Sequence, residues 1–380
     1  MTTFMDAEND SIRPTHVEVD LSALRENLAA IRVRAGAAKV MAVVKANAYG
    51  HGLVEVARHM EKCGADCLGV ALLEEGLALR KAGVTLPVLV FGGIPAAQMP
   101  SMLRHGLEMT APSVEKLRQM DEAAAAAGIR ARVHLKVDTG MGRIGVQYFN
   151  ARTLIEAGLA CRHVEVAGIY SHFANADAAD LSHARLQLER FHEALAVYEK
   201  LGVPTPARHI ANSAAILQLP ESHLDMVRPG ILLYGVQPGP ECPLTLPVRP
   251  ALTWRSRVVY FKVLPSGHPV SYGSTWQSDH PVRVVTVPCG YGDGFPRALS
   301  NKAHVLIRGA RFPVVGKVCM DQFMVNLGQG TAYNGDEVVL VGAQGGEVIR
   351  VEEVAERADT IAYEILTGIS SRVPRAHVGD

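Results

Sequence analysis

The chain is predicted to be an α/β protein with two domains, a (β/α)₈ TIM-like barrel followed by a smaller, mostly β domain. Short apolar runs alternate with amphipathic helical segments as far as about residue 235. A proline-rich stretch, 237–250, follows, and beyond it strand-like runs alternate with tight turns. We therefore expect a flexible tail at 1–14, the barrel at 15–240 and the β-rich domain at 241–380. The strand-like run at 16–20 is a candidate to pair with the second domain.

The predicted barrel strands are short runs of mainly apolar residues, as expected for parallel strands that are covered on both faces. They are VMAVVKA (40–46), CLGVAL (67–72), PVLVFG (87–92), LEMTA (107–111), VHLKVDT (133–139), VEVAGIYS (164–171), RHIAN (208–212) and MVRPG (226–230). Among the helices between them, one is expected to have Ser22 as its N-cap, and another to begin at Ser113 and end at Gly128. An open doubly wound sheet is the alternative, although no G-x-G-x-x-G follows the first strand.

Composition narrows the class of protein. The chain is 48% hydrophobic and 20% charged, which is typical of a globular protein, and its 38 basic side chains balance 38 acidic ones. Zero net charge gives no reason to expect a nucleic acid or an anionic membrane as partner. The six cysteines form no C-x-x-C pair, so we expect buried thiols in a reducing compartment and no metal site. The N-terminus does not resemble a signal peptide, and no apolar run approaches the ~18 residues of a membrane span. We expect a cytoplasmic protein.

The first candidate for chemistry is Lys45 in VVKANAYGHG (43–52). It lies where a predicted strand ends, on the face of a barrel that carries active sites. An ammonium in a dry barrel mouth is unfavourable, so its pKa should fall. Such a lysine can form a Schiff base with an aldehyde cofactor. A strand-end lysine that simply reaches solvent explains the segment equally well.

Other strand ends carry polar residues as well. HLKVDTGMGRIG (134–145) delivers Lys136 and then three glycines around Arg143, which would let the backbone approach a ligand closely. In IANSAA, Asn212 and Ser213 favour a helix N-terminus able to bind phosphate, although plain capping accounts for them too. Arg228 precedes Pro229 and Gly230 and suits a buried acceptor or a phosphate. His172 ends another strand, where an ordinary core histidine is the alternative.

Taken together, these segments resemble alanine racemase, a fold-type III pyridoxal-phosphate enzyme family. The resemblance runs from Val17 to the C-terminus, and each motif is only moderately specific. Their joint occurrence in order is highly specific. The motifs are VVKANAYGHG, DTGMGRIG, RPGI-x-LYG, SYG, GYGDG and CMDQ. This resemblance implies racemisation of L- and D-alanine with pyridoxal 5'-phosphate, and D-alanine supply for peptidoglycan. It also implies a homodimer whose subunits share each active site.

The resemblance assigns roles residue by residue. Lys45 would bind the cofactor covalently and take the α-proton of D-alanine, and Tyr272 from the partner subunit would act on L-alanine. Arg228 would contact the pyridine nitrogen, supported by His172, and Arg143 would reach the cofactor and the substrate carboxylate. Lys136 matches a lysine that is often carbamylated. Further cofactor positions are Tyr49, Asn212, Ser213, Gly230, Ile231 and Tyr363, and further substrate positions are Met320, Tyr291 and Tyr363.

The chain departs from the family pattern in one motif, because Gly292 stands where G-Y-A-D-G usually has alanine. This change bears on specificity more than on chemistry. The nearest alternatives are a serine, lysine or broad-specificity racemase of the same fold. An amino-acid decarboxylase of this fold would place an acidic residue where this chain has Arg228. A non-enzymatic cofactor carrier would lack the second domain, and a barrel without cofactor is the remaining alternative.

Overall fold

A computed structural model describes residues 13–379, which form two compact units. One, here called the barrel unit, is Ala23–Arg249, and the other, called the β unit, combines the chain up to Ser22 with Pro250–Asp380. The expected tail at 1–14 lies largely outside the described residues. Arg13, near its end, is anchored within the β unit, where its guanidinium donates to both carboxylate oxygens of Asp293.

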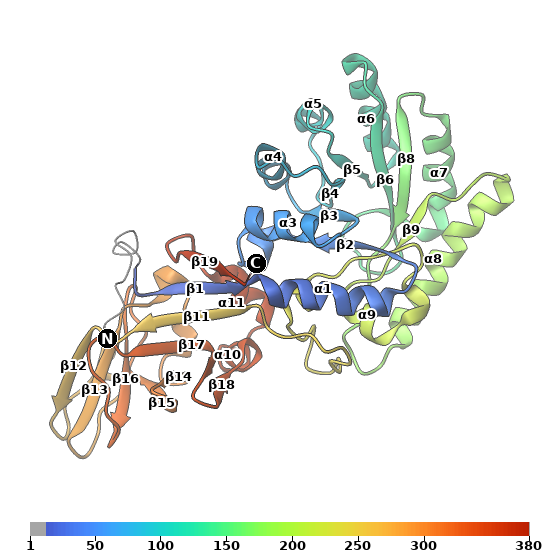
Figure 1. Ribbon diagram of the computed structural model, residues 1–380. Helices are drawn as coiled ribbons and strands as arrows, with labels where there is room; N and C mark the ends of the chain where they lie inside the picture. Colours follow the sequence, from blue (N-terminus) through green and yellow to red (C-terminus); the bar gives the residue numbers. More distant parts are fainter. Residues whose placement is uncertain (1–12, 380) are drawn as a thin grey trace. The chain divides into compact units, whose positions relative to one another are not determined.

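The barrel unit contains eight parallel strands (Figure 1). They are β2 (Lys39–Val43), β3 (Cys67–Val70), β4 (Val88–Val90), β5 (Glu108–Ala111), β6 (Ala131–Asp138), β8 (Val164–Tyr170), β9 (Ala207–His209) and β10 (Met226–Val227). A two-residue strand, β7 (Val146–Gln147), lies beside β6. The last strand, β10, pairs with the first, β2. An open doubly wound sheet would not bring its first and last strands together in this order, so the nearly closed barrel is confirmed.

Helices lie on the outer side of these strands (Figure 1). They are α1 (Leu21–Ala35), α3 (Leu53–Lys62), α4 (Leu73–Lys81), α5 (Met99–Arg104), α6 (Val114–Ala127), α7 (Ala151–Ala160), α8 (Ser182–Leu201) and α9 (Ser213–Gln218). Helix α6 is capped as predicted, because Ser113 accepts a hydrogen bond from Lys116 N and Gly128 adopts φ 63°. The prediction for Ser22 is wrong. Helix α1 begins one residue earlier, and the Ser22 hydroxyl instead donates to the carboxylate of Asp20.

The β unit is built on one large sheet with the strand order β12-β13-β16-β15-β14-β17-β11-β1-β19 and β18 beside β17. Its strands are β1 (His16–Asp20), β11 (Leu252–Arg257), β12 (Tyr260–Leu264), β13 (Val282–Val287), β14 (His304–Ile307), β15 (Ala310–Val315), β16 (Phe323–Gly328), β17 (Glu337–Gln344), β18 (Glu347–Ile349) and β19 (Arg375–Val378). The N-terminal strand β1 pairs with β11 and β19, as the sequence suggested for 16–20. Two helices, α10 (Val351–Arg357) and α11 (Ala362–Gly368), complete this unit.

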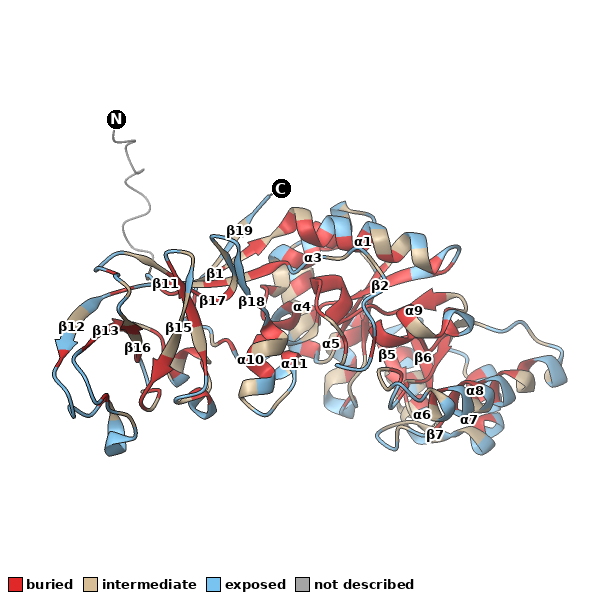
Figure 2. Cartoon of the chain, turned by 90° about the horizontal axis from the view of Figure 1, so that it is seen from below, coloured by how far each residue is buried: buried red, intermediate tan, exposed pale blue. Residues whose placement is uncertain are grey.

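The barrel strands are almost entirely buried, whereas α7 and α8 carry exposed residues on their outer faces (Figure 2). Across residues 13–379, none of the helices combines the length and the apolar character that a membrane crossing requires. The expectation of uniformly buried thiols is only partly correct. Three of the cysteines are buried, and Cys63, Cys161 and Cys319 are partly exposed because they lie at helix and loop ends.

Candidate active site

Lys45 is held at the end of β2 by an unusual turn, α2 (Lys45–Tyr49). The four residues 46–49 all have positive φ, between 52° and 55°, which gives a left-handed helical turn without glycine. This conformation costs about 1–2 kcal/mol per residue, so tertiary contacts must enforce it. Glu75 accepts a 2.6 Å hydrogen bond from Ala46 N, and the side chain of Asn47 accepts one of 2.9 Å from Leu53 N. The turn thereby fixes the backbone at Lys45.

Electrostatics favour the neutral amine of Lys45. Burial lowers its pKa first, and the positive charges of Arg143 and Arg228 lower it further, against an opposing effect of Glu75. A neutral amine is the form that can attack a carbonyl carbon or accept a proton. The structure therefore brings Lys45, Arg143 and Arg228 into one electrostatic cluster in the barrel unit.

The glycine-rich loop after β6 is organised by one carboxylate. Asp138 Oδ1 accepts hydrogen bonds from Gly140 N and Met141 N, both at 2.9 Å, and Asp138 Oδ2 accepts one of 3.0 Å from Gly142 N. Arg143 follows directly after these bonded residues and is exposed. Lys136 points into the barrel and is only 3% exposed, with its amine 4.7 Å from the centre of the Tyr170 ring. Burial, with Arg228 and Arg143, lowers the pKa of Lys136 far below its ordinary value.

Arg228 follows β10 and is 4% exposed. Its Nη2 donates to Ser171 O at 2.8 Å, to Ile210 O at 3.1 Å and to Nδ1 of His172 at 3.1 Å. Since a guanidinium only donates, Nδ1 of His172 must be the unprotonated ring nitrogen. Burial and the positive charge of Arg228 lower the pKa of His172 far below its usual range, so this imidazole is neutral. Burial also lowers the pKa of Arg228 to about 10.

The residues expected to bind phosphate form a compact cradle. Asn212 caps α9, because its side chain accepts a 3.0 Å hydrogen bond from Ala215 N. The Ser213 hydroxyl accepts a 2.8 Å hydrogen bond from Gly230 N. A Cβ at Gly230 would lie 2.4 Å from the hydroxyl oxygen of Tyr49, so only glycine fits there. Ile231 follows directly and is buried.

The β unit carries the remaining candidates on connected loops. Tyr272 is 70% exposed and lies in a turn in which Ser271 has φ 67°. The Ser271 hydroxyl donates to Lys317 O at 2.6 Å, which ties this turn to the loop that carries Met320. Tyr291 N donates to Cys319 O at 3.0 Å, so the Tyr291 loop joins the same cluster. Tyr363 lies separately, on α11.

Comparison with known proteins now adds to this geometry. The model of the alanine racemase N-terminal domain matches residues 19–238, and that of the alanine racemase C-terminal domain matches residues 251–377. The alanine racemase of Symbiobacterium thermophilum is 48% identical over 372 residues, which cover 98% of this chain and 99% of that protein. The chain belongs to the alanine racemase family.

Solved structures of this family agree in fold. The alanine racemase of the D-cycloserine producer Streptomyces lavendulae is 41% identical, with a TM-score of 0.94 over 98% of each chain. The alanine racemase of Bartonella henselae, described with covalently bound pyridoxal phosphate, is 28% identical, with a TM-score of 0.87 over 96% of this chain and 99% of that one. The expected fold class and the expectation of an enzyme of the alanine racemase family are thereby confirmed.

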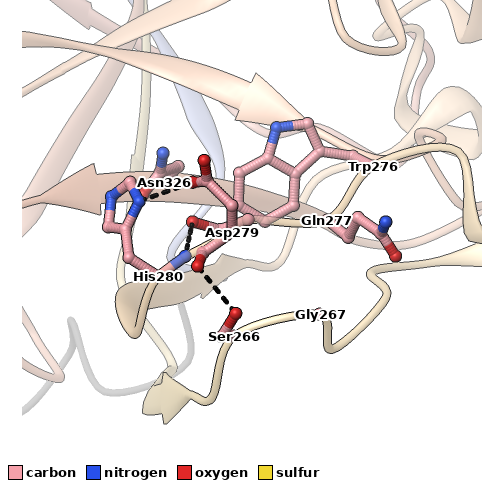
Figure 3. A pocket seen from close by; sticks show the side chains of 8 residues that line it. Ser266, Gly267, Trp276, Gln277, Asp279, His280 and Asn326 are labelled. Carbon is pink, nitrogen blue, oxygen red and sulfur yellow. Dashed lines mark hydrogen bonds and ion pairs between the residues drawn. The ribbon is translucent and has the colours of Figure 1, made fainter.

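A pocket in the β unit lies near the Tyr272 loop in sequence, but it offers little chemistry (Figure 3). Trp276, Asp279, His280 and Asn326 contribute to its lining. Asp279 and His280 pair with each other at 2.7 Å, and both side chains are exposed.

Sequence reasoning missed a group of polar residues inside the barrel. Each is buried within a strand that was interpreted from its apolar neighbours. The group comprises Glu108, Thr110, His134, Tyr170 and His209. The available signal was a polar or ionisable residue inside a run such as LEMTA, VHLKV or RHIAN. The inward or outward direction of these side chains is set by barrel closure, which no single run reveals.

Proposed function

We propose that this protein interconverts L-alanine and D-alanine with pyridoxal 5'-phosphate, using Lys45 and Tyr272 on opposite faces of the substrate. The observation that carries the proposal is the position of Lys45. Its amine has a lowered pKa and lies at the carboxyl end of a barrel strand, where Arg143 and Arg228 act on it. The family assignment supports the same reaction.

The residues present fit the cofactor. The positive charges of Arg143 and Arg228, which act on Lys45, suit an anionic ligand. The cradle of Tyr49, Ser213, Gly230 and Ile231, with Asn212 as the cap of α9, would hold the phosphate, aided by Tyr363.

The chemistry divides between the cofactor and the side chains. When bound to the substrate amine, pyridoxal phosphate makes the α-hydrogen acidic enough for a side chain to remove. Lys45 takes the α-proton of D-alanine, and Tyr272 takes that of L-alanine. Inversion at Cα requires a proton acceptor on each face. Because Tyr272 is exposed in the single chain, we propose that it acts in the partner subunit's site of a homodimer.

The remaining side chains orient the reactants. Arg228 would donate to the pyridine nitrogen of the bound cofactor and, because a guanidinium stays protonated, would leave that nitrogen unprotonated. His172 would support Arg228, and Arg143 would contact the cofactor's phenolic oxygen and the substrate carboxylate. Met320 donates a backbone N–H to that carboxylate from the partner subunit, and Tyr291 and Tyr363 narrow the pocket.

We further propose that the buried amine of Lys136 reacts with carbon dioxide, forming a carbamate and releasing a proton. This step would turn the buried neutral amine into an anion beside Arg143. The low pKa of Lys136 supports it, because the neutral amine is the nucleophile. We place the enzyme in the cytoplasm, where it supplies D-alanine for peptidoglycan.

The experiment that tests this function is the time course of D-alanine formation from L-alanine with added pyridoxal phosphate, beside a panel of other L-amino acids. Fast conversion of alanine and slow conversion of the others is expected. Comparable rates on serine or lysine would replace the proposal by a broad-specificity racemase. A protein that binds the cofactor and racemises nothing would favour the decarboxylase or carrier alternatives.

The Arg143→Gln variant should raise the pH needed for cofactor attachment. Arg143 lowers the pKa of Lys45, so its loss raises that pKa, and a higher pH is needed to obtain the neutral amine. The rate of attachment to cofactor-free protein, followed by visible absorbance against pH, should show a midpoint shifted upward. Arg152→Gln, on the exposed surface of α7, is the matched control. An unchanged midpoint in Arg143→Gln would refute the electrostatic role.

A further inference from the structure

A chain of hydrogen-bonded side chains crosses the barrel interior from Arg228 at the carboxyl ends of the strands. Arg228 Nη1 lies 3.0 Å from His209 Nδ1, and His209 Nε2 lies 2.8 Å from His134 Nδ1. His134 Nε2 lies 2.9 Å from Oε2 of Glu108, at the amino end of β5. The other carboxylate oxygen of Glu108, Oε1, accepts a 2.8 Å hydrogen bond from Arg132 Nε. Apolar branched side chains usually fill a barrel of this kind, so a buried polar chain is unusual.

The two ends of this series of hydrogen bonds determine which ring nitrogen carries the proton in each histidine. Arg228 can only donate, so Nδ1 of His209 is unprotonated and Nε2 carries the proton. That proton is donated to Nδ1 of His134, which leaves the His134 proton on Nε2. The carboxylate of Glu108, which can only accept, accepts a hydrogen bond from this Nε2–H group. One arrangement satisfies all the bonds, and in it both imidazoles are neutral.

The charges agree with this arrangement. Burial lowers the pKa of His209 far below its ordinary range, and the positive charge of Arg228 lowers it further. Burial alone would raise the pKa of Glu108, but hydrogen bonds from His134 and Arg132 and the positive charge of Arg132 outweigh burial and lower that pKa. Glu108 is therefore an anion although it is 6% exposed.

The guanidinium of Arg228 is held by hydrogen bonds to uncharged groups. Among residues 13–379 its hydrogen-bond partners are backbone carbonyls and the neutral rings of His172 and His209. Its other near neighbour is the ring of Tyr170, 5.4 Å from the guanidinium carbon. A buried cation without a counter-charge is strongly unfavourable. Glu108 is the carboxylate that the hydrogen bonds connect to it, through two imidazoles.

The barrel is shaped to accept this chain. A Cβ at Gly168 on β8 would lie 2.3 Å from His134 Nδ1, so glycine at this position makes room for the ring. The Tyr170 ring stacks on His209 with centroids 4.8 Å apart and an interplanar angle of 2°. The Tyr170 hydroxyl is hydrogen-bonded to Thr110 at 2.8 Å. Both imidazoles are thus held in place from the side.

We propose that Glu108, His134 and His209 form a positioning relay, which fixes the orientation of the Arg228 guanidinium through hydrogen bonds that end at a carboxylate at the opposite end of the barrel. None of the three acts as a catalytic residue. The functional consequence rests on the proposed role of Arg228 against the cofactor ring. The proton arrangement itself does not depend on that role.

The first test uses the cofactor-free wild-type protein with ¹⁵N-labelled histidine. The imidazole shifts of His134 and His209 should both report neutral rings with the proton on Nε2. A doubly protonated His134, or a proton on Nδ1 of either ring, would overturn the relay. This measurement needs no variant to fold and no activity, so it stands apart from the proposed function.

The second test compares Glu108→Gln with Glu165→Gln. In Glu108→Gln, the amide oxygen of the new glutamine can still accept a hydrogen bond from His134, while its NH₂ group turns to the half-exposed Arg132. This variant therefore removes the negative charge of Glu108 and keeps the direction of the hydrogen bonds in the relay. Glu165 pairs with the same Arg132 outside the relay and is the matched control. With cofactor bound, Glu108→Gln should lower kcat about tenfold and move the Nε2–H proton shift of His134, with KM little changed. Wild-type kcat and an unmoved proton shift in Glu108→Gln would overturn the role of Glu108.

Discussion

Lys45→Ala is expected to lose covalently bound cofactor and to lower alanine racemisation by at least about 10⁴-fold, the upper range for loss of one acid–base group. The substitution removes both the amine that would attach the cofactor and the base for one face. Borohydride treatment followed by intact-mass measurement should detect attached cofactor in the wild type and none in the variant. The change should leave the fold intact, because Lys45 is only partly buried and its backbone is held by separate contacts.

Lys39→Ala is the matched control, because Lys39 lies at the opposite, exposed end of the same strand, β2. It should keep the cofactor and full activity. Full racemisation in Lys45→Ala would reject the assignment of Lys45. Loss of activity in both variants, with altered thermal unfolding, would point to damage of the strand rather than to the amine.

Tyr272→Phe is expected to keep the cofactor and to lose proton removal from L-alanine by about 10²–10⁴-fold. Lys45 would still act on the other enantiomer. In D₂O the variant should therefore exchange the α-hydrogen of D-alanine for deuterium and return D-alanine without inversion. Proton NMR of the α-position, together with chiral chromatography of the product, separates exchange from racemisation.

Tyr260→Phe removes the same hydroxyl from another exposed tyrosine of the β unit, since Tyr260 is 58% exposed. It should racemise alanine at the wild-type rate. Rapid α-hydrogen exchange from L-alanine in Tyr272→Phe would contradict the two-base model, and the tyrosine would then have to act in binding alone.

The sequence predicted the fold class because barrel strands and their helices differ in hydrophobic periodicity. In addition, the proline-rich stretch separates the region of alternating strands and helices from the region of strands and tight turns. It also indicated Lys45 and Arg228, since a charged residue at the end of an apolar strand is conspicuous, and Arg143, since three glycines surround it. It did not indicate Glu108 or His134, because each lies inside its strand. Their proximity depends on the direct pairing of β5 with β6, which neither strand's own sequence reveals.

Local patterns also failed where tertiary contacts override them. Ser22 has the composition of an N-cap, yet α1 begins at Leu21. The segment KANAY carries no sequence signal for its conformation, because alanine and tyrosine rarely adopt positive φ. Glu75, which holds Ala46 from another helix, lies 29 residues further along the chain. Such contacts are invisible to any window of neighbouring residues.

The turn from Ala46 to Tyr49 has a further meaning in terms of chirality. Its backbone torsions are the mirror image of an ordinary helical turn, and mirror-image torsions are those that D-amino acids prefer. Four L-residues therefore adopt the backbone torsions that D-residues prefer, next to the lysine for which we propose a role in making D-alanine. The handedness of this stretch belongs to the folded barrel as a whole, and an isolated peptide of the same composition would wind the other way.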